Sequence, residues 1–318
     1  MNQLYKDILT AIFMGMVLPG ILLNSAVFCL DRKLPEPETQ LVEKHTINWP
    51  ITVRTGETVT QMDMDQYITG VVLAEMPASF ETEALKAQSI AARTYAQKAA
   101  VTGGKHGDGS VCTEPDCCQG YLAEEAYLQK GGTQELVEKV ANAVRDTSGV
   151  VLMYEGELIE ATYFSCSGGS TEAAVAVWGT DYPYLRSVSS PGEEQAVQYS
   201  QKLTFTPEEF MTALGKKMNG SPDGWFTFTT YTEGGGVACM SIGGESYTGT
   251  QLRSLLGLRS TAFTVEASAY EVVITTRGYG HRVGLSQYGA EAMAAAGSSC
   301  KEILAHYYPG TEWSYLEI

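Results

Sequence analysis

Basic residues are scarce in this sequence. The 318-residue chain has 21 lysine and arginine residues against 37 aspartate and glutamate residues, and its formal net charge is -16. A surface of this charge repels phosphate backbones, so a nucleic acid is not expected as a partner. Anionic polymers are also disfavoured unless a basic cleft lies inside the fold, and a neutral polymer suits the charge better.

Positively and negatively charged residues together are few, and the composition is not that of a disordered chain. They make up 18% of the chain, while apolar residues make up 44%. This composition excludes a disordered polyelectrolyte and is sufficient for a hydrophobic core. The length fits one large domain or two small ones. No internal repeat is present, and no organic cofactor is expected.

Only one long apolar run is evident, near the start of the chain. Residues 8–30 carry no formal charge, and a run of this length can cross a bilayer as a helix. A cleaved signal peptide is the alternative, but the run is long for one and 24–26 (Asn-Ser-Ala) is a poor cleavage site. We expect a cytoplasmic stub and an uncleaved signal anchor over 1–33, a linker over 34–48, and residues 49–318 outside the cytoplasm.

Helical and strand periodicities alternate irregularly along 49–318, which predicts an α+β fold. We expect a single mixed domain with a two-lobed substrate groove and an inserted lobe at 200–262. Residues 103–132 break the pattern as a glycine-rich loop that contains histidine and cysteine. The other predicted elements are strands within 49–60 and 270–276, a hairpin over 150–164, and helices over 80–100, 135–145 and 250–256, with further helices starting at 207 and 299 and one ending at 296.

Glu75 stands at the end of the apolar run GVVLAEMP. Asp63 is expected to cap the helix that contains this run, and Pro77 prevents its continuation, so Glu75 falls in the last turn. Apolar surroundings and the negative end of a helix both disfavour a carboxylate, so the pKa of Glu75 should be raised. A carboxyl group protonated near neutral pH can be a general acid on a glycosidic oxygen. The alternative is an exposed glutamate, or one paired with Lys86 or Arg93.

Three separated blocks resemble the signature of the stage II sporulation protein D family. They read YITGVVLAEMPASFETEALKAQSIAARTYA, then YFSCSGGSTE at 163–172 followed by VWGTDYPYLRSVSSP, and RGYGHRVGLSQYGAEAMA at 277–294. The blocks keep the order of the family and span residues from about 50 to 315. The resemblance implies a lytic transglycosylase of the sporulating cell, which cleaves peptidoglycan glycan strands after an amidase has removed their stem peptides.

The resemblance also implies a location and partners. It places the protein in the mother-cell membrane, facing the forespore, with a membrane-bound amidase and other engulfment proteins as partners. Two alternatives remain open. One is a non-catalytic glycan-binding activator of a cell-wall amidase, because amidase enhancers share this domain. The other is a hydrolytic muramidase, which leaves a reducing muramic acid instead of an anhydro sugar.

The resemblance carries the catalytic role onto Glu75, and onto Lys86 and Arg93 a role in orienting it or holding the sugar. In this mechanism Glu75 protonates the oxygen that leaves N-acetylmuramic acid. The same group then takes the proton of the C6 hydroxyl, which closes on C1 and forms a 1,6-anhydro sugar without water. An ordinary glycosidase needs a second carboxylate, for which Glu160, Glu172 and Asp181 are candidates.

The second and third blocks supply polar groups suited to sugar hydroxyls and acetamides. Glycines in the YGHRVGLSQYGA segment allow the backbone to approach a ligand closely, and a helix begins near its serine. The alternative is a tight strand-to-helix connection with a buried histidine. Arg282 departs from the family, in which many relatives carry a small residue. A serine nucleophile is disfavoured because no G-x-S-x-G elbow is present. The expected substrate-binding residues of these blocks are Tyr163, Ser165, Ser167, His281, Ser286, Gln287 and Tyr288.

Seven cysteines occur, and one of them, Cys29, lies in the apolar run. The even number that remains permits disulfides in an exported domain. His106, Cys112 and Cys118 follow a His-x5-Cys-x5-Cys spacing, and an imidazole with two thiolates suits tetrahedral zinc. The spacing resembles a zinc-binding insertion of some clostridial family members, which implies a structural Zn²⁺ on these three residues. Cys117 could substitute for Cys118, and Cys166 could be a fourth ligand or a disulfide partner.

Overall fold

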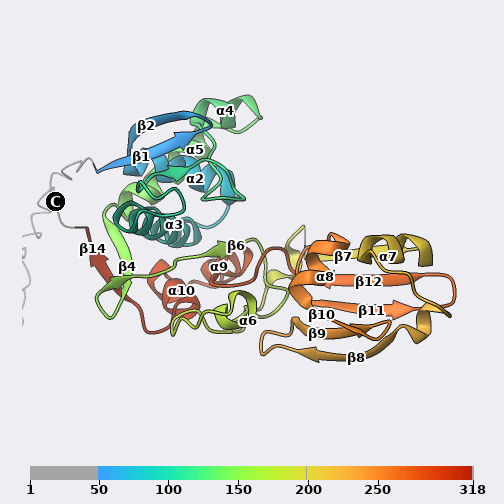
Figure 1. Ribbon diagram of the computed structural model, residues 1–318. Coiled ribbons are helices and arrows are strands. Elements are labelled where there is room, and N and C mark those ends of the chain that lie inside the picture. Colours follow the sequence, from blue (N-terminus) through green and yellow to red (C-terminus); the bar gives the residue numbers. More distant parts are fainter. Residues whose placement is uncertain (1–48, 198, 317–318) are drawn as a thin grey trace, which may run out of the picture. The chain divides into compact units, whose positions relative to one another are not determined.

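The computed structural model describes residues 49–197 and 199–316 (Figure 1). The expected anchor over 1–33 and linker over 34–48 lie outside the described residues. Within the described ranges, no helix is both long and apolar enough to span a membrane. One compact unit contains all the described residues and starts at Asn48. It is a mixed α+β structure with nine α-helices and five small sheets among these residues.

The first part of the unit is an antiparallel hairpin followed by packed helices. The alternating pattern predicted strands within 49–60, and the structure has two, β1 (Pro50–Thr55) and β2 (Thr58–Asp63), which pair with each other. Asp63 then caps α2 (Met64–Glu75) by accepting the backbone N–H groups of two residues in its first turn. The predicted end of this helix is confirmed, because Glu75 is its last residue.

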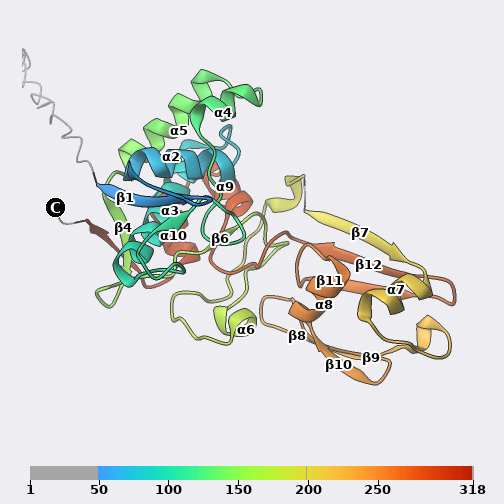
Figure 2. The same ribbon diagram turned by 45° about the horizontal axis from the view of Figure 1, so that its top comes forward.

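The long helix α3 (Thr82–Thr102) is the centre of the main hydrophobic core. Its alanines at 84, 87, 91, 92 and 96 are fully buried. Small side chains let neighbouring helices approach closely, and α3 contacts α2 and α5 (Gln134–Asp146) as well as two C-terminal helices. The views in Figures 1 and 2 both place α3 among these helices.

The chain from 150 to 164 was predicted as one hairpin, and this is correct only for its first part. β4 (Val150–Tyr154) and β5 (Glu157–Leu158) form the hairpin, with Glu155 and Gly156 at positive φ in a two-residue turn. β6 (Tyr163–Phe164) instead pairs in parallel with β13 (Leu285–Ser286). This long-range pairing brings the second and third sequence blocks together.

A second hydrophobic core is built from residues 200 to 277 (Figure 2). Its two three-stranded sheets have the orders β11-β12-β7 and β10-β9-β8. The predicted lobe at 200–262 is therefore too short, because β12 pairs along its whole length with β7. The elements are β7 (Ser200–Phe205), α7 (Pro207–Leu214), η2 (Pro222–Gly224), β8 (Phe226–Tyr231), β9 (Val237–Ile242), β10 (Glu245–Thr248), α8 (Gly249–Leu256), β11 (Phe263–Ala267) and β12 (Val272–Arg277).

The C-terminal helices return to the main core. Ser286 caps α9 (Gln287–Ala295), and Ser299 forms a capping box for α10 (Cys300–Tyr307). The last strand, β14 (Glu312–Tyr315), pairs with β4. These helix starts agree with the sequence prediction, because caps depend on residues close together in the chain.

The stretch at 103–132 is not a featureless loop. It contains β3 (Val111–Cys112), which pairs in parallel with β1, and α4 (Glu124–Gln129). Periodicity did not reveal either element because both are short. Two further short elements connect the blocks elsewhere: α6 (Ala174–Trp178) and η1 (Glu193–Gln195).

Candidate active site

A cavity of about 960 Å³ lies where the three sequence blocks meet. It collects five of the predicted catalytic and substrate-binding residues from three segments of the chain, together with Cys118 of the predicted metal ligands. Its wall also includes aromatic side chains and part of the 103–132 stretch. The five predicted catalytic and substrate-binding residues that line it are Glu75, Tyr163, Ser165, His281 and Gln287.

Glu75 enters this cavity from the end of α2. Burial raises the pKa of its carboxyl group above the ordinary value, as predicted, although the Gly120 N–H and the Gln287 side chain favour the carboxylate and limit the rise. The Gly120 N–H donates a 2.7 Å hydrogen bond to Glu75 Oε1. A Cβ atom at Gly120 would lie 2.9 Å from the same oxygen, so only glycine fits this approach without displacement.

Tyr163, on β6, lies beside the carboxyl group. Its hydroxyl accepts a 2.8 Å hydrogen bond from the side chain of Gln119. Burial and the nearby charge of Glu75 raise the pKa of Tyr163 well above its ordinary value, so the phenol stays protonated. No sequence pattern identified Gln119 or Gly120 as site residues, apart from their position just after the cysteine pair.

His281 lines the cavity as a neutral ring. Burial, and then the positive charge of Arg253, lower its pKa to about 4. Its ring centroid lies 5.3 Å from that of Trp178, and its Nδ1 accepts a 3.1 Å hydrogen bond from the Val283 N–H. The backbone of Tyr163 also forms a hydrogen bond with the ring, so this neutral imidazole is held in place in the cavity wall and is unsuited to proton transfer at neutral pH.

Arg93 does not reach the cavity. Its side chain is wholly buried and forms a 2.9 Å ion pair with Asp65 on α2. It also donates to backbone oxygens of Val144 and Thr147 at the end of α5. Its burial excludes the expected contact with a glycan. Arg93 instead holds α2, the helix that carries Glu75, against α3 and α5.

Lys86 also lies outside the cavity lining. It forms ion pairs with Glu83 at 2.9 Å and Asp146 at 3.7 Å, so the expected substrate contact finds no support. Tyr288 is likewise not among the lining residues. Its ring packs edge-on against Phe80, at 5.0 Å between centroids.

Ser167 and Ser286 are fully buried, which excludes direct contact with a polymer. Both donate hydrogen bonds to one buried carboxylate, that of Glu193, and so does the backbone N–H of Ser167. Ser190 completes this network at 2.6 Å. The buried carboxylate of Glu193 therefore connects the second block to the third through hydrogen bonds. No sequence pattern identified this residue.

Arg282 is buried as well, so it does not contact substrate. Its φ of 67° is one that favours glycine. The guanidinium forms a 3.1 Å ion pair with Glu172 and donates to the Gly234 carbonyl. Glu172 also accepts the Gly236 N–H. The pair links the second block to the turn before β9.

The three carboxylates considered as partners for Glu75 have different surroundings. Glu160 lines the cavity and forms a 2.9 Å ion pair with Lys98. Glu172 is buried beside Arg282 and does not line it. Asp181 pairs with Arg186 at 3.2 Å on the exposed surface. Of the three, only Glu160 has access to a ligand in this cavity.

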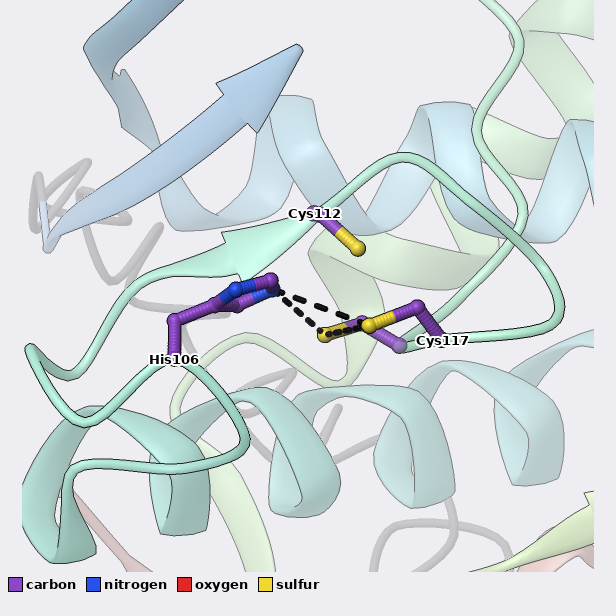
Figure 3. Close-up of side chains that lie close together, drawn as sticks. His106, Cys112 and Cys117 are labelled. Carbon is purple, nitrogen blue, oxygen red and sulfur yellow. Dashed lines mark hydrogen bonds between the residues drawn. The ribbon is translucent and has the colours of Figure 1, made fainter. Parts of the chain in front are cut away.

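His106, Cys112, Cys117 and Cys118 form one cluster at the cavity edge. Their ligand atoms all lie within 4.8 Å of one another. Figure 3 shows the ring of His106 and the sulfur atoms of Cys112 and Cys117 directed to a common point. His106 Nε2 lies 3.5 Å from Cys118 Sγ and 3.8 Å from Cys117 Sγ. The structure thus adds Cys117 to the predicted set instead of using it as a substitute.

The chemistry of this cluster fits a metal ion. Burial opposes ionisation of Cys112, but the Glu114 N–H and the His106 ring outweigh it and lower the pKa of this thiol to about 7. Burial and the neighbouring Cys112 raise the pKa of Cys118 to about 12. A divalent cation would relieve this mutual repulsion, and one imidazole with three thiolates is a tetrahedral zinc donor set.

The remaining cysteines are free thiols in the part of the chain that the structure describes. Cys166 is buried and is bridged through its backbone to Tyr279. It does not belong to the cluster, so it is not the fourth ligand. Cys239 lies on β9, and Cys300 begins α10. The disulfides considered as an alternative are absent among these described cysteines.

Comparison with known proteins identifies relatives of the chain. Residues 54–154 match the family model described as Stage II sporulation protein. The chain is 35% identical over 299 residues to Stage II sporulation protein D of Bacillus subtilis (strain 168), which covers 93% of this chain and 87% of that protein. It is 36% identical over 277 residues to the Bacillus amyloliquefaciens protein of the same description, and this match covers 86% of this chain and 80% of that protein. It is also 31% identical over 301 residues to the Amidase enhancer of Bacillus subtilis (strain 168), and this match covers 76% of this chain and 39% of that protein.

Proposed function

The chain belongs to the stage II sporulation protein D family, and on that premise we propose that it is a lytic transglycosylase that cleaves peptide-stripped peptidoglycan strands to 1,6-anhydromuramyl products. One observation carries the proposal. A carboxyl group with a raised pKa, that of Glu75, enters a cavity whose wall comes from all three family blocks. The wall offers neutral hydrogen-bonding groups and aromatic surfaces, as a glycan requires.

Glu75 acts first as the acid. Its protonated carboxyl group donates to the glycosidic oxygen as the bond to C1 of the muramic acid breaks, and the positive charge that develops at C1 is shared with the ring oxygen. The carboxylate that remains is stabilised by the Gly120 N–H. It then accepts the proton of the C6 hydroxyl while that oxygen bonds to C1, which restores the acid.

The groups around Glu75 do not take part in the proton transfers, so one carboxylate serves as both acid and base. Tyr163 is a neutral phenol and His281 is a neutral imidazole, so neither competes with Glu75 for the proton at neutral pH. Both side chains line the wall against which the sugar lies. The C6 hydroxyl belongs to the substrate, and its proximity to C1 replaces a bound water as the nucleophile.

The experiment that tests this function is product analysis on peptide-free strands. The native chain should release 1,6-anhydromuramyl ends, and Glu75→Gln should release none. Glu160→Gln is the matched control, because Glu160 lines the same cavity and would be the second carboxylate of a hydrolase. Reducing muramic acid ends, lost in both variants, would contradict a transglycosylase and indicate hydrolysis.

A structural zinc ion is part of the proposal. His106, Cys112 and Cys118 would hold it, with Cys117 as the fourth donor. The ion would fix the fold of the 103–120 stretch, whose end supplies the Gly120 N–H to Glu75. Its contribution is to position that donor, because four protein ligands leave no position for a substrate or water.

The cellular setting follows from the family and the start of the chain. We propose a single-pass membrane protein whose domain faces outward, in the mother-cell membrane opposite the forespore. Its partners would be the glycan strand, a membrane-bound amidase that removes the stem peptides, and other engulfment proteins.

A second candidate function is a non-catalytic glycan-binding activator of a cell-wall amidase. The observation in its favour is the similarity to a protein described as an amidase enhancer. Purified chain tested with peptide-free strands and no amidase separates the two functions. Strand cleavage supports the transglycosylase, whereas binding alone, with stimulation of an added amidase, supports the activator.

A further inference from the structure

A half-buried cationic side chain in the cavity wall has no anionic partner among the described residues. Arg253, on α8, lines the cavity close to His281 and Tyr279. Burial lowers the pKa of its guanidinium, and among residues 49–316 as described no carboxylate forms an ion pair with it. The end of α8 offers it only a partial negative charge. The guanidinium nevertheless stays protonated, so a fixed positive charge meets any ligand here.

Two other cations near the cavity are engaged. Lys98 pairs with Glu160, and Lys105 donates to the carbonyl oxygen of Cys117. Acidic residues outnumber basic ones by 37 to 21 in this chain, so a shortage of acids does not explain an unpaired arginine. A half-buried cation without a counter-ion costs stability, and a ligand that brings the anion recovers it.

The surroundings of Arg253 suit a sugar. The rings of Trp178 and Tyr279 are 43% and 40% exposed and line the same cavity, together with Tyr182. Arg259 lies over the ring of Tyr279, at 5.8 Å from its centroid. Exposed aromatic faces pack on the apolar C–H face of a pyranose ring, and a guanidinium binds a carboxylate through two parallel hydrogen bonds.

We propose that Arg253 binds the free lactyl carboxylate of a muramic acid residue whose stem peptide has been removed. This inference rests on the proposed function and names the group by which the cavity recognises a stripped strand. In an intact strand the same carboxyl group is an amide, which has no charge and only one oxygen to accept a hydrogen bond. The peptide would also occupy the space beside the arginine.

The inference resolves a difficulty that the charge of the chain presents. A stripped strand is a polyanion, and a protein of net charge -16 repels it at a distance. Arg253 supplies a positive charge inside the cavity, where low solvent exposure strengthens it at contact. Binding therefore depends on this local pair, and removal of the stem peptide becomes a condition for tight binding.

The test compares two forms of the same glycan. Peptide-free strands are cleaved either with free lactyl carboxylates or after conversion of these groups to neutral methylamides. The full-length chain is measured as wild type, Arg253→Gln, Arg253→Lys and Arg145→Gln. Arg145 is the matched control because it is exposed, bonds to Asn142 and does not line the cavity.

Wild-type protein should favour the carboxylate strands by roughly tenfold to hundredfold in kcat/KM, the usual worth of a hydrogen-bonded charge. Arg253→Gln should bring this preference close to one, Arg253→Lys should keep part of it, and Arg145→Gln should keep all of it. Equal cleavage of both strands by the wild type overturns the inference. So does an Arg253→Gln chain that folds and retains the full preference.

Binding to a Glu75→Gln chain separates this inference from the proposed function. This chain should bind carboxylate strands more tightly than amidated strands, and the added Arg253→Gln change should abolish the difference. That result supports the carboxylate-binding subsite at Arg253 even where wild type yields no anhydro product. In that case the transglycosylase proposal fails alone. If anhydro product forms but neither binding nor cleavage distinguishes the strands, the subsite fails alone.

Discussion

The backbone N–H of Gly120 donates a 2.7 Å hydrogen bond to the carboxylate of Glu75. Gly120 lies two residues after Cys118, at the end of the segment that carries the cysteine and histidine cluster. The proposed catalytic carboxyl group is thus hydrogen-bonded to the segment that carries the cluster. This link between the proposed metal site and the carboxyl group leads to the first two predictions.

A methyl group at position 120 should impair catalysis more than stability. In Gly120→Ala the new Cβ would lie 2.9 Å from Glu75 Oε1 and would displace the carboxyl group. A displacement of this kind costs on the order of 100-fold in rate. Release of anhydro product and the thermal midpoint are measured together. Gly224→Ala is the control, because a Cβ there meets nothing within 4 Å. An unchanged rate in Gly120→Ala would remove Gly120 from the site.

Loss of the metal should lower both stability and activity. Protein purified without added zinc should contain one zinc per chain, and Cys118→Ser should lose it. The thermal midpoint should then fall, because the ion would join His106 to the cysteines at 112, 117 and 118, and the rate should fall as the Gly120 N–H moves. Cys239→Ser is the control, since Cys239 lies on β9 outside the cluster. A metal-free chain with full stability and activity contradicts the structural role.

The activity should decrease as the pH rises through the pKa of Glu75. Burial raises this pKa above 4.5, and the first step needs the protonated form. The alkaline limb of kcat/KM on peptide-free strands should therefore have its midpoint above 4.5. A limb that reflects an ordinary exposed glutamate, with its midpoint at or below 4.5, would contradict the assigned role.

The same shift predicts how stability changes with pH. The folded chain holds the Glu75 proton more tightly than the unfolded chain, so this group contributes stability below the unfolded pKa, and the contribution is lost as the pH rises through the folded pKa. Glu75→Gln cannot ionise. At neutral pH it should unfold at an equal or higher temperature than wild type, and this difference should shrink on acidification below about 4.5. A thermal midpoint clearly below that of wild type at neutral pH would contradict the argument.

Removal of the Arg93 side chain should destabilise the protein, and any effect on substrate should follow from that. Arg93→Ala removes the cationic partner of the half-buried Asp65 and a buried donor to the backbone oxygens at the end of α5. The free energy of unfolding should fall by about 3–5 kcal/mol. Urea unfolding measures it, with Lys86→Ala as the control. Lys86 lies in a partly exposed pair and should cost no more than about 1 kcal/mol. Comparable losses in the two variants would contradict the assigned difference in burial.

Local signals in the sequence were sufficient for most helices and for the position of Glu75. Asp63, Ser286 and Ser299 cap the helices that they were predicted to begin, because a cap involves neighbours within a few residues. The spacing of His106, Cys112 and Cys118 likewise predicted a cluster. Cys117 could not be assigned in the same way, because adjacent residues in a loop can face the same or opposite sides.

The sequence by itself determined the family, the mixed α+β class, and the carboxyl group placed at the end of a helix. Only the tertiary structure decided which residues face the cavity. Ser167, Ser286 and Arg93 belong to the family blocks as firmly as His281 and Gln287 do, yet the first three are buried supports. Exposure depends on segments far apart in the chain, such as β6 against β13, and no local pattern reports those contacts. For the same reason Arg253, within an ordinary helix of the second core, gave no sign in the sequence that it stands unpaired in the wall beside His281.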